Sequence, residues 1–320
     1  MRLATFLGNA PTSSRPIVGV LVGERLLDVA GAFGALGAPG AAAGVDASSM
    51  KSLLASGKPG LAAVKEAAAR FADGLDKQHP HLFHDVASVT FLPPVPDADK
   101  FLCVGKNYRT HLEELRRTDL IKEMPQEPTG FVKLNSCLTG HGQEVVRPPS
   151  VTRLDYEPEL VFVLGRAASG VREEDAMDYV AGITILNDLT CRDTQKREVA
   201  SGSRFWTAKN APGFGPLGPY IITMDEVPDP YDIWVTCSVN GEQRMRVNTN
   251  DQIWKLPKIL AHFSRLVPLQ PGDMFSTGAP GGVAVGKPNA EDLFLKPGDA
   301  VECAFENPAM VLSNRIVASA

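Results

Sequence analysis

The stretch Asp155-Tyr156-Glu157-Pro158-Glu159-Leu160-Val161-Phe162-Val163-Leu164-Gly165 begins with acidic residues and ends in an uninterrupted apolar run. The run from Leu160 to Leu164 has the length and composition of a buried core strand, which would hold the preceding acids rigidly. Because side chains two positions apart in an extended chain point to the same face, Glu157 and Glu159 would present their carboxylates side by side. Like charges at that distance repel each other unless a proton or a metal ion lies between them.

A second apolar run, Val180 to Leu186, is followed by Asn187 and Asp188 and would bring a third carboxylate to the end of another strand. Three carboxylates with no His or Cys beside them suit a hard, oxygen-seeking cation better than Zn²⁺. The sequence therefore predicts a Mg²⁺ site, with Mn²⁺ or Ca²⁺ as alternative ions. The opposing interpretation is that the acids are solvated strand ends and that Asp188 is a turn residue.

The composition is that of an ordinary globular chain of 320 residues, 44% hydrophobic and 22% charged, with a formal net charge of -5. This acidic balance and the lack of a Lys/Arg-rich cluster argue against a nucleic-acid partner. No apolar run approaches the ~18 residues of a membrane span, so no membrane association is expected. The five cysteines are scattered and never form a Cys-x-x-Cys pair, which indicates reduced thiols in a cytoplasmic protein.

Turn signals divide the chain into two predicted domains. Residues 1 to about 30 are expected to form β structure with a two-residue turn at Gly23-Glu24, and residues 61–72 are expected to form a helix. The segment Phe91-Leu92-Pro93-Pro94-Val95-Pro96 is the best candidate for a linker. We therefore predict a small N-terminal domain over residues 1–95 and a larger domain over residues 96–320.

His111 and Glu114 lie in a segment with helical character. A spacing of three residues on a helix brings two side chains together, so the carboxylate can fix the imidazole tautomer and raise its basicity. That is a general-base arrangement. The alternative is a solvated helix face, because Glu113, Arg116 and Arg117 are also charged.

Two loops add candidate contacts to an anion. Lys209 lies in a Gly- and Pro-rich segment, where a lysine is often a surface residue, but beside a metal-bound anion it would stabilise developing negative charge. The glycine-rich run Ser276–Val283 has backbone amides that could hold an anion, although such loops are common. The chain has no G-x-G-x-x-G, phosphate-binding loop, G-x-S-x-G or Cys/His cluster.

Taken together, these segments resemble the fumarylacetoacetate hydrolase family, specifically its bacterial branch of acylpyruvate-hydrolase-like enzymes. The resemblance extends over about residues 92–315, and the N-terminal part is similar to the small leader domain of longer members. It is carried by motifs that match in order and spacing: Gly105-x-Asn107-Tyr108-x-x-His111-x-x-Glu114, Asp155-Tyr156-Glu157-x-Glu159-Leu160, Asn187-Asp188-x-x-x-Arg192-Asp193-x-Gln195, Lys209, Pro216-x-Gly218-Pro219, Asn240-Gly241-Glu242, and Pro271-Gly272-Asp273 before Thr277-Gly278-x-Pro280.

The resemblance implies a strand-dominated α+β fold, a mixed β-roll or β-sandwich with a small N-terminal α/β leader domain, usually assembled as a homodimer. It also implies a role for each matched residue. These are the metal ligands Glu157, Glu159 and Asp188, the water-activating pair His111 and Glu114 on a lid, the charge-neutralising Lys209, and Arg192, Gln195 and Thr277 at the carboxylate end of the substrate.

The activity that the resemblance implies is metal-dependent hydrolysis of a carbon–carbon bond in a 2,4-diketo acid of the acylpyruvate or fumarylacetoacetate type. The products would be pyruvate or a related keto acid and a carboxylic acid, a chemistry expected in aromatic catabolism. Alternatives on the same metal–enolate site are an oxaloacetate-type decarboxylase or tautomerase and a keto-sugar-acid dehydratase. Retention of His111 and Glu114 favours a water-using or decarboxylating enzyme over a pure isomerase.

Three positions depart from the family's usual pattern. Pro212 stands where an Asp is frequent, Ala279 where a Thr is frequent, and Ala284 where a Gly is frequent. They motivate a hypothesis of a different class, a catalytically degraded dimer that binds metal and small keto acids. Selectivity for the acyl group is expected from lid residues 112–130 and from loops near residues 205 and 280.

Overall fold

The computed structural model describes residues 1–8, 15–37, 44–117, 125–202 and 206–319. Its largest sheet contains, in spatial order, β4 (Phe83–Asp85), β3 (Arg25–Asp28), β2 (Ile17–Val22), β1 (Arg2–Leu7), β14 (Gly215–Thr223), β12 (Val180–Asn187), β11 (Pro158–Leu164), β17 (Met274–Ser276), β6 (Phe101–Gly105) and β7 (Thr129–Val132). Off this path, β5 (Thr90–Phe91) pairs with β1 and β8 (Leu138–Thr139) pairs with β14.

A second sheet has the order β16 (Glu242–Asn248), β15 (Trp234–Val239), β18 (Ala300–Phe305), β19 (Met310–Ala318) and β9 (Glu144–Arg147). A short pair joins β10 (Leu154–Asp155) to β13 (Thr190–Cys191). The α-helices among the described residues are α1 (Val29–Ala35), α2 (Met50–Ala55), α3 (Gly57–Ala72), α4 (Arg109–Arg117), α5 (Arg192–Ala200), α6 (Leu256–Ser264) and α7 (Ala290–Leu293). The strand-dominated α+β class predicted from the sequence is confirmed.

Strands β11 and β12 lie in the middle of the large sheet, as their apolar runs predict. Every residue of β11 is buried, and in β12 only the first residue is partly exposed. A strand buried on both faces shows a continuous apolar run rather than an alternating one. The two strands pair antiparallel, with Pro158 opposite Asn187 and Leu160 opposite Ile185, so the start of β11 meets the end of β12.

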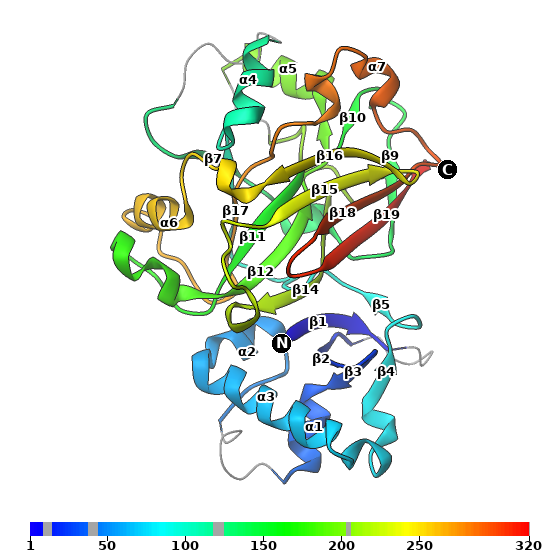
Figure 1. Ribbon diagram of the computed structural model, residues 1–320, viewed down its shortest axis with the longest axis vertical. Helices are drawn as coiled ribbons and strands as arrows, with labels where there is room; N and C mark the ends of the chain where they lie inside the picture. The colour runs from blue at the N-terminus through cyan, green and yellow to red at the C-terminus, as the bar shows by residue number, and fades with distance from the viewer. Residues whose placement is uncertain (9–14, 38–43, 118–124, 203–205, 320) are drawn as a thin grey trace.

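The alternation of side chains along β11 divides the core into two layers. Leu160 and Phe162 belong to a hydrophobic cluster that includes the inner face of the second sheet. Val161 and Val163 belong to another cluster, formed with the N-terminal helices α2 and α3. Figure 1 shows the second sheet crossing in front of β11 and β12. Helices α1 to α3 lie together in the lower part of the view. The large sheet therefore has a packed layer on each face.

The N-terminal residues share the large sheet with the rest of the chain. β1 pairs with β14, with Leu3 opposite Ile221, so the sheet continues without a break between the two predicted domains. The predicted linker 91–96 begins at the end of β5, where Phe91 pairs with Phe6 of β1. The boundary at residues 95 and 96 stays a prediction.

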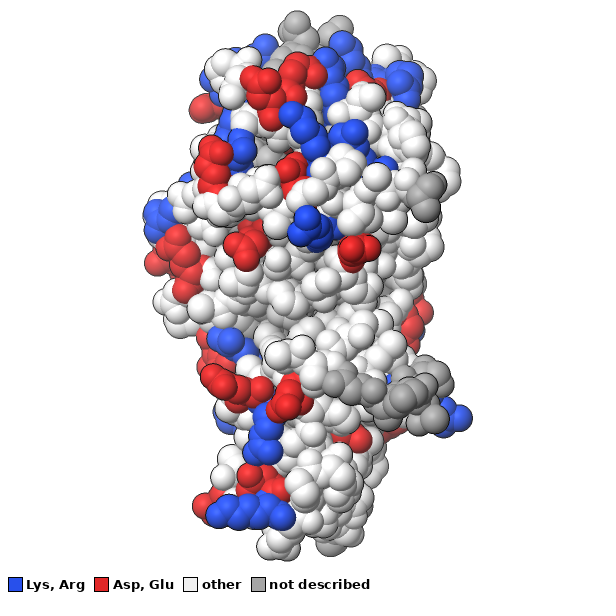
Figure 2. Space-filling model, turned by 90° about the vertical axis from the view of Figure 1, so that its right-hand side faces the viewer, with Lys and Arg blue, Asp and Glu red and all other residues white. Residues whose placement is uncertain are grey.

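Two further features of the structure are the lengths of its helices and the distribution of its surface charges. Within the described residues, none of the helices combines the length and the apolar character that crossing a bilayer requires. On the face drawn in Figure 2, acidic and basic side chains are mixed with each other and lie mainly toward the top and the left-hand side of the view.

Candidate active site

The three predicted metal ligands meet at the paired ends of two central strands of the large sheet, the start of β11 and the end of β12. Glu157 immediately precedes β11, Glu159 is its second residue, and Asp188 immediately follows β12. The backbone N–H of Asp188 donates to the carbonyl oxygen of Glu157 at 2.8 Å, which ties the two strand ends together. All three side chains are buried, and each offers a carboxylate oxygen within 4.8 Å of the others. The convergence expected from the strand pattern is present.

Two cations hold the Glu157 side of this cluster. The Lys209 ammonium lies 2.5 Å from a carboxylate oxygen of Glu157 and 2.5 Å from one of Asp188. The Arg192 guanidinium lies 2.6 Å from the other oxygen of Glu157. Burial by itself raises the pKa of Glu157, but the charges of Lys209 and Arg192 outweigh burial and lower the pKa to about 2. Glu157 is therefore ionised at neutral pH.

Glu159 has different surroundings. Its carboxylate accepts a hydrogen bond from the Ser276 hydroxyl, whereas the ion pairs of Lys209 and Arg192 go to other carboxylates. Burial, together with the neighbouring charge of Asp188, raises the pKa of Glu159 well above its usual value. A divalent cation would remove this repulsion, and an all-oxygen donor set of three carboxylates fits a hard cation. The residues present therefore fit a metal ion of that class.

Lys133 is part of the cluster, and the sequence analysis did not identify it. Its side chain is fully buried, and its ammonium donates to Asp188 at 2.7 Å and to the backbone carbonyl of Lys209 at 2.5 Å. Burial opposes the charge, but the neighbouring groups, Asp188 foremost among them, together outweigh burial and raise the pKa of Lys133. A sequence signal existed, because Lys133 lies two positions after the buried Phe131 and so falls on the inward face of an alternating strand.

Asp155 links the cluster to a loop and was likewise given no role from the sequence alone. Its carboxylate accepts from Arg192 Nε at 2.8 Å and from the backbone N–H groups of Ala284 and Val285 at 2.9 and 3.0 Å. Asp155 is completely buried. It therefore positions both Arg192 and the loop that contains Ala284, one of the departures from the family pattern.

His111 and Glu114 lie together on α4, as their spacing predicts. The Nδ1 atom of His111 is 3.3 Å from a carboxylate oxygen of Glu114, and His111 faces the pocket. The other oxygen of Glu114 accepts from the backbone N–H of Gly282 at 2.7 Å. The start of α4 is held by Asp251, which accepts from both the N–H and the hydroxyl of Thr110. The pair is thus fixed from two loops that are distant in sequence.

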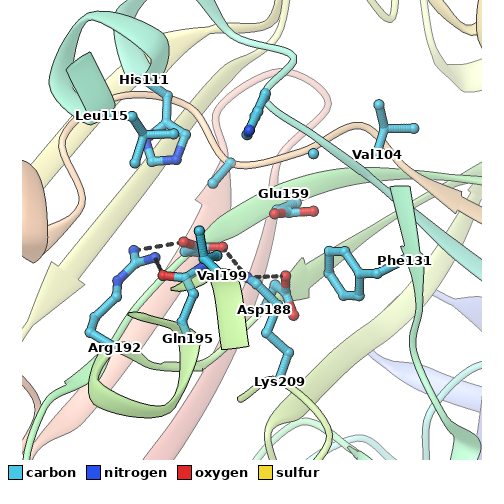
Figure 3. A pocket seen from close by; sticks show the side chains of 14 residues that line it. Val104, His111, Leu115, Phe131, Glu159, Asp188, Arg192, Gln195, Val199 and Lys209 are labelled. Carbon is cyan, nitrogen blue, oxygen red and sulfur yellow. Dashed lines mark hydrogen bonds and ion pairs between the residues drawn. The ribbon is translucent and has the colours of Figure 1, made fainter. Parts of the chain in front are cut away.

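The three carboxylates, Lys209 and His111 line one pocket, which contains about 530 Å³ of empty space, part of it open solvent. Figure 3 shows Glu159, Asp188 and Lys209 converging there, with His111 to one side and Phe131 to the other. Arg192 and Gln195 also line the pocket and bond to each other at 2.9 Å.

Thr277 is placed differently. It is completely buried and is absent from the described residues that line the pocket. Its hydroxyl donates to the Leu160 carbonyl oxygen at 3.0 Å and lies 3.3 Å from the Tyr108 hydroxyl. Ala279, two residues later, does line the pocket, whereas Pro212 is exposed.

Part of the predicted acyl-selective region lies outside the described residues. This applies to residues 118–124 of the expected lid 112–130 and to residues 203–205 of the loop near 205. Of the expected lid, Leu115 lines the pocket. The assignment of acyl selectivity to these loops stays a prediction.

Comparisons with known proteins agree with this geometry. The family described as fumarylacetoacetate (FAA) hydrolase C-terminal matches residues 100–317. A human protein named oxaloacetate tautomerase FAHD2A, mitochondrial, is 38% identical over 231 residues, which are 72% of this chain and 70% of that protein.

Two solved structures are similar over the whole of both chains. One is a fumarylacetoacetate hydrolase from Exiguobacterium antarcticum, with a TM-score of 0.73 and 27% identity. The other is maleylpyruvate hydrolase from Sphingobium sp. SYK-6 in complex with manganese(II) ion and pyruvate, with a TM-score of 0.71 and 25% identity.

Proposed function

The chain belongs to the fumarylacetoacetate hydrolase family, and from this membership we propose that it is a metal-dependent hydrolase of a 2,4-diketo acid. The observation that carries the proposal is the convergence of three buried carboxylates and the His111–Glu114 pair around one pocket. The proposed cleavage needs an activated water and stabilisation of the departing enolate, and one pocket contains groups suited to both.

Glu157, Glu159 and Asp188 would hold the cation. A bound divalent ion would act as a Lewis acid toward the carboxylate and the adjacent 2-oxo oxygen of the substrate. We propose Mg²⁺ because the donors are all oxygen atoms. The manganese complex of maleylpyruvate hydrolase supports Mn²⁺ as an alternative, and Ca²⁺ is a third candidate.

Three side chains would have roles in the proton transfer and in the stabilisation of charge. His111, oriented by Glu114, would take a proton from a water molecule that attacks the distal carbonyl carbon. The bond between that carbon and the methylene carbon then breaks, and its electron pair becomes the enolate of the 2-oxo acid. Lys209 would offset the negative charge of the enolate oxygen. The proton taken by His111 would return to the methylene carbon, which gives a pyruvate-type keto acid and a carboxylic acid.

The test is loss of the diketone absorbance of acetylpyruvate, with a coupled assay for pyruvate, in the presence of Mg²⁺ and of a chelator. Wild type should release pyruvate only with metal, and His111→Ala should lose at least about 100-fold in kcat. Metal binding without turnover on a panel of keto acids would instead support the catalytically degraded dimer.

A second candidate is tautomerisation of oxaloacetate, which the name of the human relative favours. The same groups would move a proton between the methylene carbon and the enol oxygen, with no water consumed. Enol and keto oxaloacetate differ in ultraviolet absorbance, so their interconversion can be followed directly. Consumption of oxaloacetate with release of pyruvate would indicate decarboxylation, and turnover of a keto-sugar acid alone would indicate a dehydratase.

The assembly belongs to the same proposal. We expect a homodimer, with a small anionic diketo acid as the substrate and no nucleic-acid or membrane partner. Sedimentation equilibrium measures the assembly directly, and a monomer at micromolar concentration would contradict this part of the proposal.

A further inference from the structure

Gly286 is packed against the carboxylate of Glu114. A Cβ atom placed at Gly286 would lie 2.6 Å from Cδ, 2.8 Å from Oε2 and 2.9 Å from Cγ of Glu114. Nonbonded carbon atoms favour separations of about 3.5 Å or more, so a methyl group has no room here while Glu114 keeps its position. Oε2 is also the oxygen that lies 3.3 Å from Nδ1 of His111. The missing side chain at residue 286 therefore makes room for the contact between Glu114 and the proposed base.

The backbone around Gly286 is held in place. Residues Ala284–Gly286 form a 3₁₀ turn. The N–H groups of Ala284 and Val285 donate to the carboxylate of Asp155, at 2.9 and 3.0 Å, and this carboxylate is completely buried. A group added at residue 286 would therefore displace the flexible end of the glutamate side chain rather than the turn.

Helix α4 is docked on the same loop at a second glycine. A Cβ atom at Gly281 would lie 2.7 Å from Cβ of Thr110. The N–H of Gly281 donates to the Thr110 hydroxyl at 3.1 Å, and the N–H of Gly282 donates to Oε1 of Glu114 at 2.7 Å. Thr110 and Glu114 are four residues apart, so they lie on one face of the helix. This face lies directly against the backbone of the loop, which sets the position of the helix and of its carboxylate together.

The orientation of His111 depends on this carboxylate. An ionised carboxylate can only accept hydrogen bonds, so its contact with Nδ1 keeps a proton on that nitrogen and leaves Nε2 as the nitrogen that can take one. A displacement of about 1 Å at such a contact can lower a rate about 100-fold. A small shift of Glu114 would therefore impair proton transfer while the metal ligands, which lie on β11 and β12, stay in place.

We propose that Gly286 is a positioning residue of the reaction, which keeps the Glu114 carboxylate against Nδ1 of His111 because it has no side chain. The inference rests on the proposed function, because it takes His111 as the group that moves the proton. It applies to hydrolysis and to tautomerisation, since both require a proton transfer. Its consequence is that Gly286→Ala acts on the rate through Glu114 and through no other group.

The test is a double-mutant cycle of Gly286→Ala and Glu114→Ala, measured with Mg²⁺ on acetylpyruvate and on oxaloacetate. Gly286→Ala alone should lower kcat about 10- to 100-fold and change KM by less than about twofold. Glu114→Ala removes the three atoms that the new methyl group would meet, so adding Gly286→Ala to it should lower kcat by less than about twofold further. Equal losses of kcat in the two backgrounds would overturn the proposal.

A matched control is Gly34→Ala on α1. Apart from its own helix and chain neighbours, the added methyl group would meet no atom of the described residues within 4 Å. This variant should keep the kcat of wild type. A loss of kcat in Gly34→Ala as large as that in Gly286→Ala would overturn the proposal, because the effect would not depend on contact with Glu114.

Thermal unfolding separates displacement of the carboxylate from damage to the fold. The methyl group added by Gly286→Ala occupies space that Glu114→Ala vacates, so the double variant should melt no lower than Glu114→Ala. This comparison remains informative even if Gly286→Ala alone is destabilised. A double variant that melts well below both single variants would show that residue 286 acts on other groups, and it would overturn the proposal.

Nuclear magnetic resonance of ¹⁵N-labelled histidine side chains gives a measurement that needs no turnover. The chain has six histidines, and the signals of His111 can be assigned by their loss in His111→Ala. In Gly286→Ala these signals should move to the shifts found in Glu114→Ala, because the Nδ1 contact is broken in both. Signals that stay at the wild-type shifts would overturn the role of Gly286. Absence of Mg²⁺-dependent turnover by wild type would instead overturn the proposed function.

Discussion

Two ion pairs in this molecule have similar distances between their charged atoms but very different exposure to solvent. On the second sheet, Arg246 and Glu306 form a bidentate pair at 2.6 and 2.8 Å, with side chains 39% and 41% exposed. The Arg246 guanidinium also lies 3.7 Å from the centroid of the Trp234 ring. At the pocket, the ammonium nitrogen of Lys209 is 2.5 Å from a carboxylate oxygen of Glu157, and both side chains are almost completely buried.

Water explains why similar distances have different consequences. On the surface, solvent stabilises each charge whether or not its partner is present, so the pair contributes little to folding. In the pocket, each charge depends on its neighbours, and removal of one leaves another buried without compensation. Burying this cluster of carboxylates and cations makes the free energy of folding less favourable, which indicates that the cluster is retained for chemistry. The following predictions test this contrast.

The largest effect is expected from Glu159→Gln. The change keeps the shape of the side chain but removes one of three carboxylates from the metal site, so Mg²⁺-dependent turnover should fall at least about 1,000-fold. Because Lys209 and Arg192 form their ion pairs with other carboxylates and burial raises the pKa of Glu159, the metal-free variant should melt at the wild-type temperature or above. Calorimetric metal titration and thermal unfolding measure the two effects. A large loss of metal-free stability would show that Glu159 has a structural role.

A large effect on folding is expected from Lys133→Met. The variant leaves Asp188 buried with one cation fewer, and the free energy of unfolding should fall by about 3 kcal/mol. Urea unfolding monitored by circular dichroism provides the measurement. As a control, Lys51→Met removes a partly exposed lysine paired with Asp99 and should change stability much less. Equal losses in the two variants would remove the distinction between the buried and exposed pairs.

An intermediate effect is expected from Asp155→Asn. The amide keeps one hydrogen-bond acceptor but loses the charge that holds Arg192, so kcat should fall about 10- to 100-fold while Mg²⁺ affinity stays near wild type. Kinetics at saturating Mg²⁺ and a metal titration test both statements. A variant with normal kcat would mean that Arg192 is positioned well enough by Glu157 and Gln195 alone.

The smallest effect is expected from Arg246→Gln. Loss of the exposed pair with Glu306 should shift the melting temperature by less than about 2 °C and leave turnover unchanged. Differential scanning calorimetry has the required precision. A much larger shift would mean that the stacking of Arg246 on Trp234 contributes more than the exposure of the pair suggests.

The centre of the fold and the acidic cluster follow from local sequence patterns. The apolar runs of β11 and β12 predicted core strands, and alternation along an extended chain placed Glu157 and Glu159 on one face. The i, i+3 spacing placed His111 beside Glu114. In each case the deciding geometry lies within a few residues, where backbone periodicity is sufficient.

The contacts that the sequence did not reveal depend on residues far apart in the chain. Lys133 reaches Asp188 across 55 positions, and Asp155 binds the amide of Ala284 across 129 positions. Thr277 matched a motif, but its hydroxyl is bonded to Leu160 rather than turned to the pocket, which only the packing of β17 against β11 decides. Local periodicity carries no information on such pairings.

The pairing of β1 with β14 also has a consequence for synthesis. The first residue and Thr223, which bond to each other, are 222 positions apart. A ribosome adds about 5 to 20 residues per second, so β14 is synthesised roughly 10 to 45 s after β1. Throughout that time the part of β1 that pairs with β14, Arg2 and Leu3, is open to β strands of other nascent chains, whereas Phe6 and Leu7 can already pair with β5. Translation speed and chaperone supply should therefore affect the yield of this protein more strongly than its compact final structure suggests.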